Sequence, residues 1–360
     1  EEISLSRRLF TVGPVNVEPE VLQSTTKPMI THRSKEYKQL HGNIVEKIRK
    51  ALGTDMNVFL LGGSATVLIE GSVRNAVSKK CLSISNGSFG ERMIDCATYN
   101  GKEVVAVKVP WGRAMRPSHI EGKVGEDIES VNWVSNESST GVLSDSVAIA
   151  GEVRKQNPDA MIIVDAVTSA FAADLKVDKM GADAIVFGTQ KALALPPGLA
   201  IGLISDRIIE RSAKIPNSGY YTNFQKLKKN ADENYALTTP PVSLLYGLDY
   251  QLDRALSEGM AARYRRHDKM ASMVEKWADE NLNGLFPEEG SRSKTIGVLN
   301  RGELDFDAFH KALKAKGYEI SNGYGEVKSS TFRIGHMGDV TPDTLAELLD
   351  TMKGIMEEMK

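Results

Sequence analysis

Short apolar runs alternate with amphipathic stretches along the first two thirds of the chain. The spacing predicts helices over residues 64–78 and 89–99 and strands at 57–63, 81–85, 104–109, 131–135, 161–167, 184–188 and 199–204. The predicted strands are rich in Val, Ile and Leu and do not alternate cleanly with polar residues, which is typical of a parallel sheet buried on both faces. The pattern therefore predicts an α/β domain with a mostly parallel sheet flanked by helices. Such a domain binds ligands at the carboxyl ends of its strands.

The pattern changes after Pro240 and Pro241. The elements predicted beyond this point are a long helical stretch over 242–281, a strand at 295–299, a helix over 306–316, strands near Tyr318 and Phe332, and a final helix from Thr341. They predict a smaller C-terminal α+β domain on a long connecting helix. We expect an N-terminal arm over residues 1–16, a large domain over 17–260 and a small domain over 261–360.

Composition and charge narrow the class of protein. The 41% of hydrophobic residues is ordinary for a globular protein, and 360 residues are enough for two domains. A formal net charge of −2 gives no reason to expect nucleic acid or an anionic membrane as a partner. Cys81 and Cys96 lack metal or redox spacing, so we expect reduced thiols, no metal and a cytoplasmic protein. No apolar run is long enough to span a membrane, and residues 1–4 lack the features of a signal peptide.

An acidic residue and a lysine each stand at the end of a predicted buried strand. Asp165 follows residues 161–164, where a carboxylate is costly to bury unless it is paired; alone it is as typical of a helix cap or an ion pair. Lys191 follows the strand at 184–188, and its apolar neighbours would desolvate the amine and make it nucleophilic. Together they suit a pyridinium cofactor, because the lysine can form an imine with an aldehyde while the carboxylate pairs with the ring nitrogen.

A third segment has the pattern of a phosphate site. Residues 60–63 end a predicted strand in two glycines, and Ser64, Ala65 and Thr66 begin the helix that follows. Helix N-termini bind phosphate through free N–H groups and the positive end of the dipole. Alone, Ser64 is as typical of a plain helix cap, and the segment matches neither a Walker loop nor a dinucleotide fingerprint. Beside Asp165 and Lys191 it is a credible site for the phosphate of the cofactor.

The lysine segment also resembles that of a known family. Residues 188–198, Gly-Thr-Gln-Lys-Ala-Leu-Ala-Leu-Pro-Pro-Gly, resemble the cofactor-lysine segment of class V aminotransferases, in particular the alanine–glyoxylate and serine–pyruvate group. Residues 9–17, 86–92, 137–141 and 332–335 are similar to other segments of that family, so the likeness covers most of the chain. The resemblance implies a fold-type-I transferase that uses pyridoxal 5′-phosphate and acts on an amino acid and a 2-oxo acid. It also implies a homodimer with active sites at the interface.

The resemblance implies a role for each matching residue. Lys191 would form the Schiff base and move the proton, and Asp165 would pair with the pyridinium nitrogen. Arg333 would bind the substrate α-carboxylate, and Gly13 is expected to contact substrate as well. The remaining expected cofactor contacts are Phe89 and Val167 on opposite ring faces, Ser64, Ala65, Thr66 and Gln190 at the phosphate, Ser138 near the ring hydroxyl, and Tyr235 and Thr238 at the phosphate of the neighbouring subunit.

Two positions depart from the family pattern. Phe89 stands where many relatives have tryptophan, but a phenyl ring still stacks on an aromatic cofactor. Ala65 stands where a glycine is expected in the phosphate site. This change is tolerable because backbone N–H groups bind the phosphate there.

The sequence leaves the substrate open. Alanine or serine as donor with glyoxylate or pyruvate as acceptor, in a ping-pong reaction, is the first expectation. His32-Arg33-Ser34 resembles the segment that binds the substrate phosphate in phosphoserine aminotransferases. The alternative is therefore phosphoserine or aspartate with 2-oxoglutarate, with Arg33 at the distal anion. A solvated helix start explains the segment equally well. A lyase or desulfurase is less expected because Gln190, not histidine, precedes Lys191. A non-catalytic scaffold is less expected because acid, lysine and arginine are all present.

Overall fold

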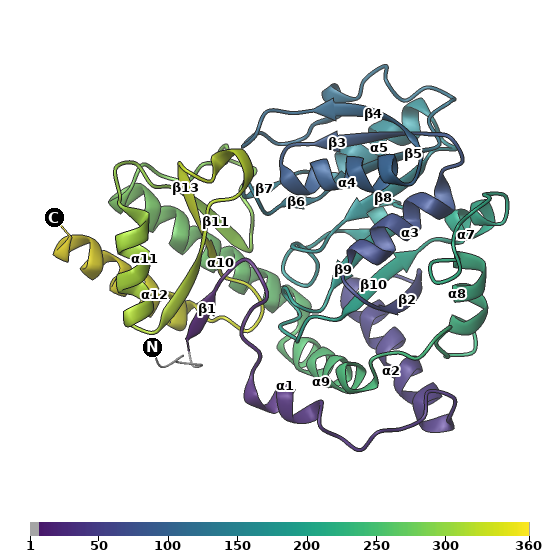
Figure 1. Ribbon diagram of the computed structural model, residues 1–360, viewed down its shortest axis with the longest axis horizontal. Coiled ribbons are helices and arrows are strands. Elements are labelled where there is room, and N and C mark those ends of the chain that lie inside the picture. Colours follow the sequence, from purple (N-terminus) through teal and green to yellow (C-terminus); the bar gives the residue numbers. More distant parts are fainter. Residues whose placement is uncertain (1–6, 360) are drawn as a thin grey trace.

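The computed structural model describes residues 7–359, which form two main β-sheets side by side (Figure 1). Residues 1–4, on which the expectation about a signal peptide rests, lie outside this range. The larger sheet has seven strands in the order β2-β10-β9-β8-β5-β3-β4, and β10 runs antiparallel to both of its neighbours. Their bounds are β2 Asn57–Gly62, β3 Lys80–Ser85, β4 Glu103–Lys108, β5 Ser130–Val134, β8 Met161–Asp165, β9 Ala184–Gly188 and β10 Leu199–Ile204.

Alternate side chains of the larger sheet enter two separate hydrophobic clusters, one on each face. In β8, Ile162 and Val164 belong to one cluster, while Met161 and Ile163 belong to the other. Both faces are therefore buried, which explains why the strands read as continuous apolar runs. One cluster is completed by α3 Thr66–Ala76 and α4 Ser88–Tyr99, and the other by α2 Lys35–Leu52, α5 Ser146–Gln156 and α9 Val242–Glu258.

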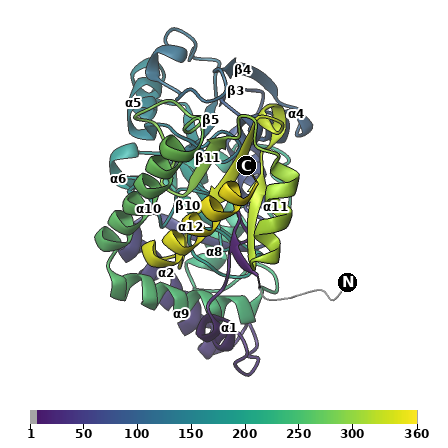
Figure 2. The ribbon, with the colours of Figure 1, turned by 90° about the vertical axis from the view of Figure 1, so that its left-hand side faces the viewer.

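The smaller sheet combines both ends of the described chain. Its order is β1-β12-β13-β11, with β1 Arg8–Phe10, β11 Ile296–Asn300, β12 Tyr318–Asn322 and β13 Thr331–Gly335. The helices α10 Met260–Asn281, α11 Phe306–Ala315 and α12 Pro342–Glu358 pack on it around a third hydrophobic cluster (Figure 2). β1 pairs in parallel with β12, so residues expected to form only an arm add a strand to the C-terminal sheet.

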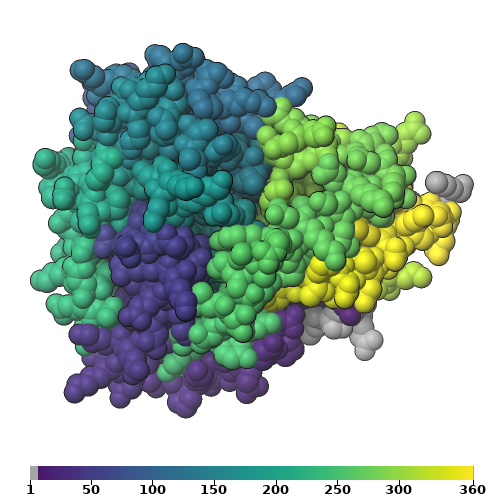
Figure 3. Space-filling view, turned by 180° about the vertical axis from the view of Figure 1, so that it is seen from behind, coloured from purple at the N-terminus to yellow at the C-terminus, as the bar shows by residue number. Residues whose placement is uncertain are grey.

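The long helical pattern predicted over residues 242–281 is two helices. Gly259 separates α9 from α10 and has a φ of 82°, a backbone conformation that residues other than glycine rarely adopt. The predicted domain boundary at residue 260 coincides with the start of α10 and stays a prediction. On the back of the molecule, the violet segment that contains α2 lies beside green α9 (Figure 3).

The remaining elements are short and connect the layers. They are α1 Pro19–Ser24, β6 Asn136–Glu137, β7 Val142–Leu143, α6 Val177–Met180, α7 Asp206–Ser212, α8 Phe224–Ala231 and the 3₁₀ turns Pro117–His119 and Gly325–Val327. Within residues 7–359, no helix has the length and apolar character needed to cross a membrane.

Candidate active site

A cavity of about 210 Å³ lies at the carboxyl ends of the parallel strands. Nine of its lining residues were expected from the sequence: Ser64, Ala65, Thr66, Phe89, Ser138, Asp165, Val167, Gln190 and Lys191. The loops that follow β5, β8 and β9 bring several of these residues together, because parallel strands end at one edge of a sheet.

Lys191 is half-buried in the turn that follows β9. Burial, followed by the positive charge of Arg333, lowers the pKa of the Lys191 amine to about 8. The Nζ atom donates a hydrogen bond to the carbonyl oxygen of Val12. A much larger share of this amine is therefore unprotonated near neutral pH than for a lysine in water, as a nucleophile requires.

Asp165 is the last residue of β8 and is only 6% exposed. Its Oδ1 atom accepts a hydrogen bond from the N–H of Val167 at 2.8 Å, and burial raises the pKa of the carboxyl group to about 6. No salt bridge to Asp165 is found within residues 7–359. A buried carboxylate in this state is a favourable partner for a cation that enters the cavity.

The first turn of α3 presents backbone donors to the same cavity. Ala65 precedes the helix, and no side chain caps its N-terminus. The N–H groups of Ser64, Ala65 and Thr66 make no hydrogen bond to the part of the chain that is described. Gln190 closes this side, and its Oε1 would lie 2.7 Å from a β-carbon on Gly188, so glycine gives it room. Amides of this kind at a helix N-terminus are suited to a phosphate group.

Phe89 and Val167 contribute the apolar walls of the cavity. The carboxylate of Glu137 accepts hydrogen bonds from the N–H groups of Phe89 at 3.1 Å, Gly90 at 2.9 Å and Ser139 at 3.1 Å. Glu137 is completely buried, and burial raises the pKa of its carboxyl group. Glu137 thus anchors the first turn of α4, which carries the ring of Phe89.

The smaller sheet places Arg333 beside the cavity. This side chain is 8% exposed, and its Nε donates to the carbonyl oxygen of Asn322 at 2.9 Å while Nη1 donates to that of Ser138 at 3.2 Å. The guanidinium group lies 5.2 Å from the ring centre of Tyr324, and burial lowers its pKa to about 10. It is a buried cation suited to a carboxylate, although it does not itself line the 210 Å³ cavity.

Gly13 lies against the side chain of Lys191. It has a φ of 101°, and a β-carbon at this position would approach Lys191 Cδ to 2.6 Å. The backbone of the N-terminal segment therefore covers the lysine chain from the side of the smaller sheet. The peptide bond between Gly13 and Pro14 is cis.

A second group of expected residues lies apart from this cavity within the chain. Arg33 is exposed, and its Nη1 donates to the carbonyl oxygen of Ala236 at 3.1 Å. Tyr235 is half-buried, with the Lys38 ammonium 5.6 Å from its ring centre, and Thr238 lies two residues after Ala236. Arg33 thus contacts the segment that contains Tyr235 and Thr238. These three residues are called one cluster below, and none of them lines the cavity of Lys191.

Several cavity residues were not predicted from the sequence: Ile69, Arg92, Val134, Asn136 and Thr168. Arg92 stands 4.8 Å from the ring centre of Phe89. The hydroxyl groups of Thr168 and Ser138 are 2.7 Å apart. Helical spacing could have found Arg92, because it follows Phe89 by three residues on α4 and so shares its face.

The residues present fit pyridoxal phosphate. The cavity combines amides at a helix N-terminus for a phosphate, a buried carboxylate with no salt bridge inside residues 7–359 for a ring nitrogen, and an amine of lowered pKa for an aldehyde. Phe89 and Val167 add apolar contacts for a flat ring. These donors and acceptors correspond to the functional groups of that cofactor.

Comparisons with known proteins agree with this geometry. The family model for "Aminotransferase class-V" matches residues 20–335. An uncharacterized aminotransferase of Methanocaldococcus jannaschii is 34% identical over 93% of this chain and 89% of its own. The L-aspartate–glyoxylate aminotransferase of Paracoccus denitrificans is 31% identical over 98% of this chain and 91% of its own. The structure of alanine–glyoxylate aminotransferase from Nostoc sp. superposes with a TM-score of 0.90 at 25% identity, covering 99% of this chain and 97% of its own.

The chain belongs to the class V aminotransferase family. It is an aminotransferase that depends on pyridoxal phosphate, and it has the fold-type-I architecture that the sequence predicted. The resemblance to the alanine–glyoxylate and serine–pyruvate group is likewise confirmed by relatives that carry alanine–glyoxylate and serine–glyoxylate names.

Proposed function

We propose that the enzyme moves the amino group of a small amino acid, alanine or serine, to glyoxylate or pyruvate in two successive half-reactions. The observation that carries this proposal is the shared cavity of Lys191 and Asp165, with Arg333 at its side. The names of the relatives favour glyoxylate as acceptor, since the Paracoccus denitrificans and Nostoc proteins both carry it.

Each of these residues has a distinct task. Pyridoxal phosphate, when bound, supplies an aldehyde that bonds to amines and a ring that withdraws electrons from the carbon bearing the amino group. Lys191 holds and returns the proton of the substrate α-carbon, and its lowered pKa suits both directions. Asp165 would keep a proton on the ring nitrogen by pairing with the positive charge. Arg333 would bind the α-carboxylate through its planar fork and so orient the α-hydrogen towards Lys191.

The residues around them hold the cofactor. The N–H groups of Ser64, Ala65 and Thr66 and the side chain of Gln190 would bind the phosphate. Phe89 and Val167 would enclose the ring, and Ser138 would contact its hydroxyl group.

A panel of amino donors against oxo acids tests the proposed substrates. Initial rates are measured for alanine, serine, aspartate and phosphoserine, each with glyoxylate, pyruvate and 2-oxoglutarate. We expect the highest kcat/KM for alanine or serine with glyoxylate or pyruvate, and parallel double-reciprocal lines that indicate a ping-pong reaction. Highest activity with 2-oxoglutarate and an acidic donor would replace this proposal by the alternative.

The alternative substrate class has its own support. Arg33 is an exposed guanidinium in the cluster with Tyr235 and Thr238, and the Paracoccus denitrificans relative is named for L-aspartate. If Arg33 meets a distal anion, Arg33→Ala should lower kcat/KM for aspartate or phosphoserine by roughly tenfold or more, because a charge-assisted hydrogen bond contributes about 1.5–3 kcal/mol. The rate with alanine should hardly change. Equal losses for neutral and acidic donors would show that Arg33 is structural.

We also propose that the active unit is a homodimer. An apolar hollow of about 560 Å³ lies beside the lysine segment and includes Met29, Ile30, Pro197 and Pro240. The Met29 side chain is 68% exposed in the single chain. An exposed apolar side chain beside an apolar hollow is expected where a second subunit covers the surface. The cluster of Arg33, Tyr235 and Thr238 adjoins this hollow through His32 and Thr239, so it would approach the active site of the neighbouring subunit.

A cytoplasmic location is favoured by the two free, buried cysteines.

A further inference from the structure

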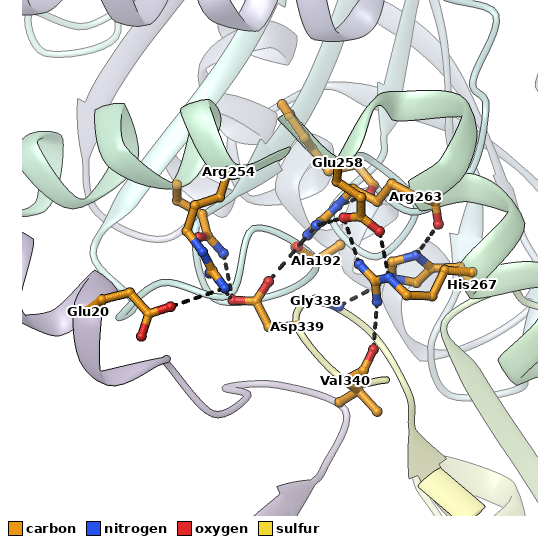
Figure 4. Close-up of polar contacts among 12 residues, drawn as sticks. Glu20, Ala192, Arg254, Glu258, Arg263, His267, Gly338, Asp339 and Val340 are labelled. Atoms are coloured by element: carbon orange, nitrogen blue, oxygen red, sulfur yellow. Dashed lines mark hydrogen bonds and ion pairs between the residues drawn. The ribbon is translucent and has the colours of Figure 1, made fainter. Parts of the chain in front are cut away.

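Six charged side chains form a cluster around the junction of α9 and α10 (Figure 4). They come from α1, α9, α10 and the loop after β13, with three positive and three negative charges: Glu20, Arg254, Glu258, Arg263, Arg266 and Asp339. The Arg263 side chain is only 3% exposed, whereas that of Arg254 is 32% exposed. A guanidinium group buried to this degree needs partners for its N–H groups, so the identity of those partners matters.

The donors of Arg263 reach the two loops that carry the acid and the lysine. Its Nε donates to the carbonyl oxygen of Phe171 at 3.0 Å, and its Nη2 donates to that of Ala192 at 2.6 Å. Phe171 belongs to the loop after Asp165, and Ala192 directly follows Lys191. The remaining Nη1 pairs with Glu258 at 2.8 Å, which fixes the orientation of the planar fork. One rigid group thus ties the backbone of both loops together.

Each of the two loops contains a residue other than glycine whose backbone has a positive φ. Phe171 has a φ of 64° and Ala194 a φ of 49°. Residues other than glycine avoid this region, and such conformations persist where surrounding contacts enforce them. Arg263 contacts both loops near these positions. In the first loop it binds Phe171 itself, and in the second it binds Ala192, two residues before Ala194.

The same part of α10 also holds the segment that follows Arg333. Burial and the charge of Arg263 keep the pKa of His267 well below its usual range, so its ring is neutral. Its Nε2 accepts the N–H of Gly338 at 3.2 Å, and its Nδ1 donates to the carbonyl oxygen of Arg263 at 2.8 Å. Gly338 lies against the lysine loop, since a β-carbon there would stand 2.9 Å from the Cβ of Ala194. The loops of Asp165, Lys191 and Arg333 are therefore all attached near Arg263.

We propose that Arg263 is a positioning residue, which holds the backbone of Lys191 and of the Asp165 loop so that amine and carboxylate reach the same cofactor. This inference rests on the proposed roles of Lys191 and Asp165. Arg263 touches neither reacting group and acts through the carbonyl groups of Phe171 and Ala192.

The matched pair Arg263→Lys and Arg254→Lys tests the proposal. Both substitutions keep the charge and remove a planar fork from the same cluster. Arg254, however, binds Gln251, Asp339 and Glu20 and has no bond to either loop. In the holoenzyme, hydrogen–deuterium exchange is followed in peptides over residues 166–173 and 189–195. The second peptide contains the amides of Ala194 and Leu195, which donate to Lys191 and Thr189 inside the loop.

We expect Arg263→Lys to speed exchange in both peptides by about tenfold or more, and Arg254→Lys to leave them within about twofold. Arg263→Lys should also shift the pH midpoint of the cofactor absorbance and lower kcat, with little change in KM because Arg333 remains. If Arg263→Lys does not fold, Arg263→Gln with Glu258→Gln removes the charges together, and the same peptides are measured.

Unchanged exchange in both peptides, or equal changes in the Arg254 variant, would overturn the proposal. The exchange result does not depend on the chemistry assigned to Lys191. Reduction of the wild-type holoenzyme followed by peptide mapping tests that assignment separately, so the two failures are distinguishable.

Discussion

Gly13 and Lys191 are in such close contact that a β-carbon on Gly13 would stand 2.8 Å from the lysine Nζ. We predict that Gly13→Ala lowers cofactor affinity and turnover, the latter by about tenfold or more, because the methyl group would displace the amine. Cofactor binding is measured by titration of the apoenzyme, and turnover by steady-state rates.

Gly53→Ala is the matched control for this prediction. Gly53 also has a positive φ, of 62°, but within the described chain no atom lies within 4 Å of the point where its β-carbon would stand. The substitution should cost about 1 kcal/mol of stability from backbone strain and leave activity intact. Equal loss of activity in both variants would mean that strain, and not contact with Lys191, causes the effect.

The buried carboxyl of Asp165 should make the stability of the apoenzyme depend on pH. Its pKa is about 6 in the folded chain, against an ordinary value of 3.8. The folded chain therefore binds more protons between these values, so this group stabilises the fold at low pH and the contribution is lost as pH rises through 6. In Asp165→Asn that loss should be absent. Thermal unfolding of both apoenzymes at pH 4.5 and pH 7 measures the difference, and identical pH dependence would contradict the assigned burial.

The same substitution should separate binding from catalysis. Asp165→Asn should retain the cofactor through its phosphate contacts but lose about a hundredfold or more in kcat, because an amide cannot pair with a charged ring nitrogen. Cofactor content by absorbance and kcat on the best donor are compared in one preparation. Turnover close to that of the wild type would exclude the role given to Asp165.

Tyr235→Phe tests the shared active site. If the Tyr235 hydroxyl reaches the phosphate in the neighbouring subunit, this variant should release cofactor more readily than the wild type with an unchanged order of donor preference. Sedimentation of the wild type should show a dimer or larger. Tyr250→Phe, at another partly exposed tyrosine, is the control. An active monomer would contradict the proposed interface.

Local patterns predicted the strands of the larger sheet and the meeting of Asp165 and Lys191 in one cavity. The strands around Asp165 and Lys191 are continuous apolar runs, and parallel strands must present their carboxyl ends at one edge, so acid and lysine were expected together. The proposed phosphate site was predicted from the glycine turn before Ser64. In each case, residues close in sequence determined the geometry.

Contacts between residues far apart in the sequence could not be predicted from local patterns. β1 has three residues and pairs with β12 more than 300 positions later, so no local periodicity indicates it. Arg263 lies close to Arg265 and Arg266 in the sequence, and such a run reads as a solvated helix face. Its burial depends on the loops of Phe171 and Ala192, which only the folded chain brings to α10.

Lys191 is the residue that we propose to form the covalent bond with the cofactor. The most direct measurement is reduction of the holoenzyme with borohydride, followed by digestion and mass spectrometry of the modified peptide. We expect one pyridoxyl adduct, on Lys191, and none in Lys191→Ala, which should also lack turnover. An adduct on a different lysine, or full turnover in Lys191→Ala, would show that Lys191 does not hold the cofactor.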